Sequence, residues 1–246
     1  MKVRFSDRSG YVREGRFDGD RIHAAGRSFT PEQVAWLPPS HSTKVICLAR
    51  NVAAHAAEHD SEVPDRPSYF LKPPSSLAAH RSTVTIPEAI DSVEYEAELA
   101  AVIARQVTNV EQPAVDKVVA GLTCMNDLSN RADQRRELNW VRGKAFDGAA
   151  PIGPGLVDPG EVPSDASIEL SINGEVVQSG RRSEYEFDLE SVLVDLSRYL
   201  TLEPGDVIAL GTPAGVGPIE HGDSVNVSIE GIGTLSHTVE YASHEE

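Results

Sequence analysis

The residues of this chain best suited to chemistry are two glutamates, Glu96 and Glu98, which stand two positions apart at the start of the apolar run Leu99–Ile103. Residues i and i+2 of a β-strand point to the same face of a sheet. A strand here would bring two carboxylates together, and they would repel each other unless a cation or protons lay between them. Hard divalent cations such as Mg²⁺ and Ca²⁺ prefer such oxygen ligands. The alternative is a solvated strand face in an acidic protein.

A third carboxylate, Asp127, strengthens the metal interpretation. It opens a stretch with helical character, in which Leu128 and Leu138 are apolar positions. Asp127 would stand at the N-terminus of that helix, with Arg131 and Gln134 further along the same helical face. The alternatives are a simple N-cap role for Asp127 and an exposed polar surface for the other two residues.

His55 and Glu58 form a separate constellation after the apolar, strand-like run Val45–Ala49. At a spacing of three residues, both side chains face the same way on a helical turn. A carboxylate beside an imidazole holds its tautomer and raises its basicity, which suits a general base acting on water. The alternative is a short exposed helix with an incidental ion pair.

The same stretch contains a competing zinc motif. His55, Glu58 and His59 match H-x-x-E-H, in which two histidines bind zinc and the glutamate acts as the base. Pro64 and Pro67 follow closely, so no long helix can carry the motif. No third ligand stands in a matching helix later in the chain, and we therefore do not favour a zinc protease.

Taken together and in this order, the motifs of the chain resemble the fumarylacetoacetate hydrolase family, in its branch of acylpyruvases and 2-hydroxyhepta-2,4-diene-1,7-dioate isomerases. The resemblance covers roughly residues 44–240. It is carried by Arg50-Asn51 with His55 and Glu58, Tyr69–Pro73, Glu94–Glu98, Asn126–Arg131 with Gln134, Gly143–Phe146, Pro151–Pro154, Asn173–Glu175, Pro204–Ile208 and Gly211–Gly217. No single motif is decisive, but the whole series is very specific.

The resemblance implies a role for each matching residue. It implies a site for Mg²⁺ or Mn²⁺, with Ca²⁺ as a further candidate, on the carboxylates of Glu96, Glu98 and Asp127. It implies a catalytic group made of His55, Glu58, Lys144 and Gln134, in which the first two activate water and Lys144 lies beside the reacting carbonyl. It implies that the substrate is held by Arg131, Lys72, Thr212 and Asn51.

Two positions depart from the pattern of the family. The family usually has an aromatic residue where this chain has Val52, which predicts a different wall on one side of the pocket. It usually has Asp after the helix arginine, where this chain has Ala132. That second change removes one group that could orient Arg131.

The site predicts metal-dependent hydrolysis of a carbon–carbon bond in an acylpyruvate or 1,3-diketo acid. A divalent cation would chelate two substrate oxygens and stabilise the enolate that forms when the bond breaks. Without attack by water, the same site could tautomerise, decarboxylate or dehydrate a 2-keto acid. An alternative of another class is a binding protein that has lost catalysis, but His55, Glu58, Lys144 and the three carboxylates are all retained.

The composition argues against one class of partner. The formal net charge is −16, from 22 Lys and Arg against 38 Asp and Glu, so a nucleic-acid partner is not expected.

Only five of the basic residues are lysines, a pattern similar to the acidic, lysine-poor surfaces of proteins from salt-loving microbes. High salt would screen the self-repulsion of such a chain. An ordinary acidic protein is the alternative.

The remaining features predict a cytoplasmic protein. Met1–Phe5 has no apolar signal core, and no apolar run reaches the ~18 residues of a membrane span. Cys47 and Cys124 lie in apolar stretches and are expected to be buried free thiols in a reducing compartment. The partners expected are a small 2-keto or diketo acid and, from the family resemblance, a second copy of the chain in a homodimer.

The elements that would position these residues are mostly strands. Residues 1–40 contain short polar strands and predict a small N-terminal appendage that ends near Pro38-Pro39-Ser40, and residues 41–246 would form the catalytic domain. Asn173-Gly174 predicts a hairpin, and the alternation in Ser224–Ile229 predicts a strand. A helical stripe of core residues is predicted at Leu189, Val192, Leu193, Leu196, Tyr199 and Leu200, ending before Pro204-Gly205. The pattern indicates an α+β fold with a rolled mixed sheet, and the family resemblance implies its β-roll.

Overall fold

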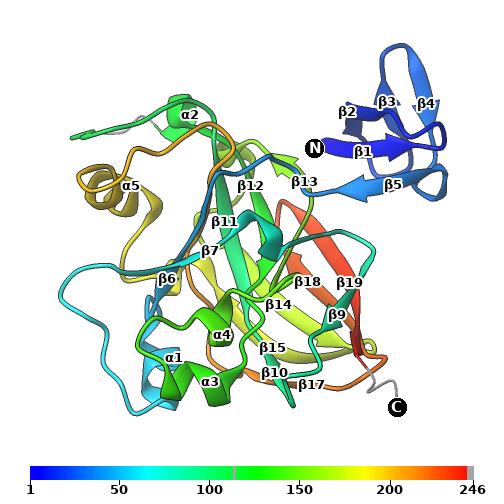
Figure 1. The fold of residues 1–246 in the computed structure, drawn as a ribbon. Coiled ribbons are helices and arrows are strands. Elements are labelled where there is room, and N and C mark those ends of the chain that lie inside the picture. The colour runs from blue at the N-terminus through cyan, green and yellow to red at the C-terminus, as the bar shows by residue number, and fades with distance from the viewer. Residues whose placement is uncertain (113–114, 243–246) are drawn as a thin grey trace.

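The computed structural model describes residues 1–112 and 115–242 and shows an α+β fold that is mostly β (Figure 1). Its sheets mix parallel and antiparallel pairs, which confirms the predicted fold class. The strands are β1 Lys2–Asp7, β2 Val12–Phe17, β3 Ile22–Ala24, β4 Arg27–Phe29, β5 Val34–Leu37, β6 Val45–Ala49, β7 Ser68–Lys72, β8 Leu77–Ala79, β9 Ser82–Ile86, β10 Val93–Tyr95, β11 Ala97–Ile103, β12 Val119–Asn126, β13 Ala150–Val157, β14 Ser167–Ile172, β15 Glu175–Arg181, β16 Val207–Ala209, β17 Gly217–Ile219, β18 Ser224–Ile229 and β19 Gly233–Tyr241. The helices are α1 Ala53–Glu58, α2 Val115–Val118, α3 Arg131–Arg136, α4 Val141–Lys144 and α5 Leu189–Ser197, with short 3-10 turns at Pro31–Gln33, Pro74–Ser76, Pro159–Glu161 and Arg182–Glu184.

The first five strands form an N-terminal lobe (residues 1–40), which Figure 1 shows at the edge of the molecule. β1 pairs antiparallel with β2 and β5, and the chain continues from β2 through β3 to β4. The lobe has its own small core, made of Val3, Phe5, Ile22, Ala24, Phe29 and Trp36. A single register pair, Lys2 with Leu156, connects β1 to β13 of the main sheet. We retain the division between this lobe and a catalytic domain of residues 41–246 as a proposal.

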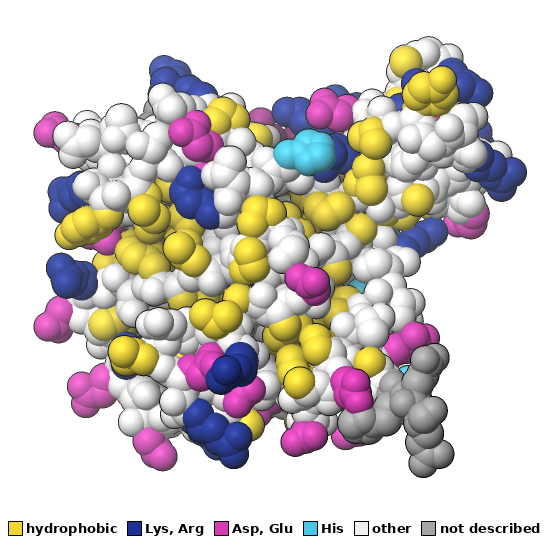
Figure 2. Space-filling view, viewed as in Figure 1, with side chains coloured by type: hydrophobic (Ala, Val, Ile, Leu, Met, Phe, Trp, Pro, Cys, Tyr) yellow, Lys and Arg dark blue, Asp and Glu magenta, His cyan; other side chains and the backbone are white. Residues whose placement is uncertain are grey.

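The N-terminal lobe is the basic part of an acidic chain. Residues 1–40 contain seven Lys and Arg against five Asp and Glu. Figure 2 shows Lys and Arg side chains gathered on this lobe, while Asp and Glu side chains are spread over the lower part of the same face. The negative charge of the protein therefore belongs to the remainder of the chain.

The main sheet has β11 and β12 at its centre, within the order β13-β12-β11-β16-β6-β7. β11 pairs antiparallel with β12, and Ala97 lies opposite Asn126 at the end nearest the predicted site. All seven residues of β11 are buried, which explains why the sequence shows a continuous apolar run here and no alternation. Its one charged residue, Glu98, stands at the second position of the strand.

A second sheet, in the order β15-β14-β18-β19-β9, packs across the core from the main sheet. The predicted hairpin is confirmed between β14 and β15, where Asn173 and Gly174 have φ values of 53° and 89°. These left-handed values are the ones that a type I′ turn requires. β18 alternates between buried residues and exposed or partly buried ones, as its sequence predicts.

α5 follows the predicted apolar stripe, with one correction. Four of the predicted core residues are buried in it: Leu189, Val192, Leu193 and Leu196. The helix ends at Ser197, well before Pro204, so Tyr199 lies beyond its last turn and is 70% exposed. The prediction that Tyr199 belongs to the core is therefore wrong. None of the helices in the described ranges has the length and apolar content that a membrane-spanning helix needs.

The short helices α1, α3 and α4 gather at one end of the main sheet (Figure 1). α1 follows the buried strand β6, and α3 and α4 follow β12. These three short helices therefore lie beside the ends of the central strands, where the predicted carboxylates stand.

Candidate active site

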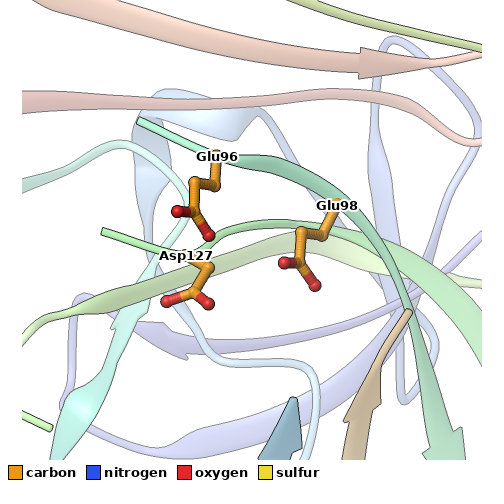
Figure 3. Close-up of side chains that lie close together, drawn as sticks. All are labelled: Glu96, Glu98 and Asp127. Atoms are coloured by element: carbon orange, nitrogen blue, oxygen red, sulfur yellow. The ribbon is translucent and has the colours of Figure 1, made fainter. Parts of the chain in front are cut away.

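The three predicted carboxylates meet at the end of the central strand pair. Glu96 lies in the break between β10 and β11, Glu98 is the second residue of β11, and Asp127 directly follows β12. One oxygen from each lies within 4.8 Å of the others, and all three residues are buried. Figure 3 shows the three side chains turned toward one another. We call this group the carboxylate triad.

The position of Asp127 corrects one expectation. It does not begin a helix, because α3 starts only at Arg131 and its N-cap is Asn130, whose side chain accepts a hydrogen bond from the backbone of Asp133. Leu128 is fully buried, whereas Leu138, expected as its partner on a helix, is 95% exposed. Asp127 reaches the triad because antiparallel pairing of β11 and β12 brings the end of one strand beside the start of the other.

The backbone around the triad is fixed by hydrogen bonds that the sequence did not reveal. The Glu96 N–H donates to the side-chain oxygen of Asn126 at 2.9 Å, and the Asp127 N–H donates to the carbonyl of Glu96 at 2.9 Å. The amide of Asn126 also contacts the buried ring of His237 at 3.0 Å. Asn126 therefore joins β12 to the residue before β11 and to β19.

Three cations surround two of the carboxylates. Lys144 Nζ donates to Glu96 at 2.7 Å and to Asp127 at 2.9 Å. Arg131 donates to Glu96 at 2.5 Å, and Lys72 Nζ lies 2.7 Å from Asp127 Oδ1. Burial raises the pKa of Glu96, but the charges of Lys144 and Arg131 outweigh it, so the net pKa lies well below its usual range. Burial lowers the pKa of Lys144, but Asp127 and Glu96 raise it more, so this ammonium stays charged.

Glu98 differs from its two neighbours because it has no cationic partner in the described parts of the chain. It is 1% exposed and accepts a hydrogen bond from the Gly211 N–H at 3.0 Å. Burial, followed by the negative charges of Asp127 and Glu96, raises the pKa of this carboxyl well above its usual range. Asp127 Oδ1 has no well-directed hydrogen bond among the described residues, but Lys72 Nζ lies 2.7 Å from it. Three buried carboxylates close together, one of them without a cationic partner, fit a hard divalent cation.

His55 and Glu58, the two residues predicted to act together as a general base, are in contact on α1. His55 Nδ1 lies 3.3 Å from Glu58 Oε2, and the other oxygen of Glu58 accepts a hydrogen bond from the Gly215 N–H at 2.7 Å. The rings of His55 and His59 lie 5.0 Å apart, but no third ligand among the described residues completes a zinc site with them. Within residues 1–112 and 115–242, the carboxylate triad is the only group of three potential ligands close enough to share an ion.

A cavity of about 640 Å³ connects these groups. It is lined by eight of the predicted site residues: His55, Glu58, Glu96, Glu98, Arg131, Gln134, Lys144 and Thr212. The Thr212 hydroxyl accepts a hydrogen bond from Gln178 at 2.8 Å. The structure thus brings together residues that lie far apart in the sequence around one common space.

Lys72 and Asn51 do not line this cavity, although both were expected to bind substrate. Lys72 donates to the backbone carbonyls of Leu128, Lys144 and Ala149, and its Nζ lies 2.7 Å from Asp127 Oδ1. The side chain of Asn51 bonds to the backbone of Phe187 and Leu210. The hydrogen bonds of both side chains are made with the backbone around the site. We therefore propose that Lys72 and Asn51 position this backbone and do not bind the substrate directly.

Val52 and Ala132, the two departures from the family pattern, alter the pocket wall and the orientation of Arg131 less than expected. Val52 is 2% exposed and does not line the cavity, so it does not change the pocket wall directly. Arg131 keeps a defined orientation without an acidic residue at position 132, because it donates to Glu94 at 2.7 Å, to Gln134 at 2.6 Å and to Glu96.

Several lining residues were missed by the sequence reasoning. Phe70 and Trp140 form an apolar wall, with ring centroids 5.5 Å apart, and Lys144 Nζ lies 5.1 Å from the centroid of Phe70. Arg50 and Arg135 line the same cavity. Arg50 and Phe70 stand in motifs that carry the family resemblance, and Trp140 lies four residues before Lys144, so these positions were the available signals.

Solved structures share this fold over its whole length. A 5-carboxymethyl-2-hydroxymuconate delta-isomerase from Mycobacterium smegmatis is 36% identical with a TM-score of 0.89, and the match covers 99% of this chain and 100% of that one. A 2-hydroxyhepta-2,4-diene-1,7-dioate isomerase from Mycobacterium marinum is 32% identical with a TM-score of 0.87, covering 98% of each chain.

Sequence comparisons agree with the structural ones. An oxaloacetate tautomerase of Bacillus subtilis is 36% identical over 213 residues, which are 82% of this chain and 71% of that protein. The model of the fumarylacetoacetate (FAA) hydrolase C-terminal domain matches residues 44–240. The chain therefore belongs to the fumarylacetoacetate hydrolase family of enzymes.

Proposed function

We propose that this protein is a divalent-cation-dependent enzyme that converts 2-keto or 1,3-diketo acids by way of their enolates. The observation that carries the proposal is Glu98, a buried carboxylate without a cationic partner in the described ranges, beside Glu96 and Asp127 in the triad. Mg²⁺ or Mn²⁺ would be held by these three residues, with Ca²⁺ as a further candidate. When bound, such a cation supplies Lewis-acid polarisation of substrate oxygens.

The remaining residues have roles that follow from their contacts. Lys144 contributes a charged ammonium to the lining of the cavity, where it can stabilise an oxyanion together with Gln134. Glu58 is bonded to both His55 and the Gly215 N–H, so it orients the ring of His55. With the proton on Nδ1, Nε2 of His55 is the atom that accepts a proton. Arg131 and Thr212 line the cavity, and we propose that they contact the substrate.

Carbon–carbon hydrolysis of an acylpyruvate is our first candidate reaction, because the His55–Glu58 pair lies on the same cavity as the triad. Nε2 of His55 would take a proton from water while the water oxygen bonds to the distal carbonyl carbon. The carbon–carbon bond then breaks, and its electron pair passes to the enolate. That enolate takes up one proton, and the products are a carboxylic acid and a 2-keto acid.

Tautomerisation or isomerisation of a 2-keto acid is the second candidate. It is favoured by the relatives, since two solved structures are named as isomerases and the Bacillus subtilis protein as an oxaloacetate tautomerase. In this reaction His55 would move a proton between carbon and oxygen, and no water would add. Both candidates pass through the enolate of a 2-keto acid. It forms by cleavage of the carbon–carbon bond in the first reaction and by removal of a proton from carbon in the second.

The substitution Glu58→Gln tests the assignment of the base. It keeps the size of the side chain but removes the charge that supports His55, so turnover of acylpyruvates should fall by about 10²–10⁴-fold while binding of Mg²⁺ and oxalate is retained. Product analysis by NMR distinguishes cleavage from enol–keto conversion. Unchanged turnover in the variant would show that His55 and Glu58 are not the base. Enol–keto conversion without cleavage in the wild type would replace the first candidate by the second.

A further inference from the structure

Gln178 is a buried side chain that joins the carboxylate triad to the segment that follows β16. It belongs to β15 and is 2% exposed. Its amide oxygen accepts a hydrogen bond at 3.0 Å from the N–H of Ala97, which stands between the two glutamates of the triad. Its amide nitrogen donates to the Thr212 hydroxyl and to the Pro213 carbonyl, both at 2.8 Å. Gln178 does not line the cavity, so it acts on the site only through these partners.

The partners of Gln178 fix the orientation of its amide group. The Ala97 N–H can only donate a hydrogen bond, and the Pro213 carbonyl can only accept one. The reverse orientation would place the amide nitrogen against the Ala97 N–H and the amide oxygen against the Pro213 carbonyl, and neither pair forms a hydrogen bond. The amide nitrogen therefore faces Thr212, and one of its hydrogens goes to the hydroxyl oxygen.

The Thr212 hydroxyl is consequently an acceptor toward Gln178, and its own hydrogen lies in another direction. Among the described residues no group accepts this hydrogen, because the bond from Gln178 is the one that the hydroxyl makes there. Thr212 is 3% exposed and lines the cavity that the triad also lines. A buried donor needs an acceptor, and a ligand oxygen in the cavity can supply it.

The position of Thr212 relative to the triad is fixed as well. The N–H of Gly211, the residue before it, donates to Glu98 of the triad at 3.0 Å, and the Tyr185 hydroxyl donates to the Gly211 carbonyl at 3.1 Å. β15 packs closely against the same segment, since a Cβ atom on Gly180 would lie only 2.4 Å from the Cβ of Pro213. A small ligand at the triad can therefore also reach the Thr212 hydroxyl.

We propose that Gln178 is a positioning residue that makes the Thr212 hydroxyl a hydrogen-bond donor toward a carboxylate or enolate oxygen of the substrate. This inference rests on the proposed function, in which Thr212 contacts the substrate. The alternative is that Gln178 only satisfies buried polar groups and holds two segments together. Under the proposal, the effect of Gln178 on ligand binding passes through one hydroxyl group, whereas a general loosening of the site does not depend on that group.

A double-mutant cycle on the binding of oxalate separates these two roles, measured by isothermal titration calorimetry at saturating Mg²⁺. Oxalate offers acceptor oxygens and no donor. Thr212→Val keeps the shape but removes the hydroxyl, so the affinity should fall about 10-fold, whereas Thr212→Ser should stay within about threefold of the wild type. Gln178→Met should weaken binding several-fold in the wild type and in Thr212→Ser, but by less than about twofold when it is combined with Thr212→Val.

Gln106→Met is the matched control, because Gln106 is an exposed glutamine that donates to Glu203 at the surface. It should leave the affinity for oxalate unchanged. If Gln178→Met does not fold, Gln178→Glu takes its place in the cycle with the same expected pattern. A carboxylate at this position cannot donate to the Thr212 hydroxyl and would accept its hydrogen instead, which withdraws that hydrogen from the ligand.

The outcomes distinguish this inference from the proposed function. If oxalate fails to bind to the wild type with Mg²⁺, the proposed function itself is contradicted. If oxalate binds to the wild type but Thr212→Val binds it equally tightly, the hydroxyl donates nothing to the ligand and this inference alone is overturned. It is overturned in the same way if the change at Gln178 weakens binding equally with and without the Thr212 hydroxyl.

Discussion

At the scale of single residues, the triad shows what spacing can and cannot reveal. Glu96 and Glu98 were predicted to share one face because strand residues alternate, and the structure places both in the triad. Asp127 was predicted at the same site on the basis of a helix that does not begin there. Asn126, which fixes the backbone of Glu96, was not predicted, because its role depends on a contact between strands that no local pattern encodes.

Lys72 gives a prediction at this scale. Its buried ammonium lies 2.7 Å from Asp127 and donates to three backbone carbonyls. Lys72→Met would leave these groups without their partner, so the free energy of unfolding of the metal-free protein should fall by about 3–5 kcal/mol. Mg²⁺ should restore part of the loss, because a cation at the triad compensates the charge of Asp127. Thermal and urea unfolding with and without Mg²⁺ measure both effects.

The matched control for this prediction is Lys117→Met, which removes an exposed lysine on α2. It should change stability by no more than ~0.5 kcal/mol. A Lys72 variant that is as stable as this control would contradict the positioning role that we propose for Lys72.

At the scale of elements, the sequence predicted the strands and the hairpin better than the helices around the site. The Asn173-Gly174 hairpin and the alternation in β18 are local signals, and both are confirmed. α3 and α4 are short, polar and separated by an exposed loop, so neither has the apolar stripe by which helices are recognised. Their positions are set by tertiary contacts such as those of Arg131 with Glu94 and Glu96.

Two buried histidines join elements and predict how stability depends on pH. His80 packs against Trp36 of the N-terminal lobe with ring centroids 4.7 Å apart, and its Nδ1 accepts a hydrogen bond from the Ser236 N–H of β19. His237 of β19 contacts Asn126 of β12. Burial lowers the pKa of both histidines to about 4. In the unfolded chain a histidine titrates near pH ~6.5.

Between these two pKa values the unfolded chain binds more protons than the folded one, so stability should fall as the pH falls from about 6.5 to about 4. In this window each histidine changes the free energy of unfolding by up to about 1.4 kcal/mol per pH unit, and its contribution levels off below the pKa of the folded state. Urea unfolding at several pH values measures this dependence. The free energy of unfolding should change less steeply with pH in His237→Gln than in the wild type. His221→Gln removes an exposed histidine and serves as the control. An unchanged slope for His237→Gln would contradict the neutral, buried state of His237.

At the scale of the whole molecule, charge is the dominant feature. The chain carries a net charge of −16, while the N-terminal lobe has more basic than acidic residues. The expectation of a homodimer comes from the family resemblance and stays a prediction, as do adaptation to high salt and a cytoplasmic location. Cys47 and Cys124 are buried free thiols, as the sequence predicts.

The charge predicts how salt affects stability. Repulsion among acidic groups on the surface is screened more strongly as ionic strength rises, so the melting temperature should increase as KCl is raised from about 0.1 M into the molar range. Differential scanning fluorimetry over a KCl series measures this directly. A melting temperature that stays flat or decreases over that range would show that adaptation to high salt is a wrong inference.

The central claim is that Glu96, Glu98 and Asp127 hold a divalent cation that supports enolate formation from a 2-keto acid. Exchange of the C3 protons of 2-oxobutyrate with deuterium from D₂O, followed by NMR, tests it most directly, because exchange reports the enolate whichever product is finally formed. With Mg²⁺ the wild type should catalyse this exchange, and both a chelator and the substitution Glu98→Gln should abolish it. Exchange that continues at the same rate in the chelator and in the variant would contradict the claim.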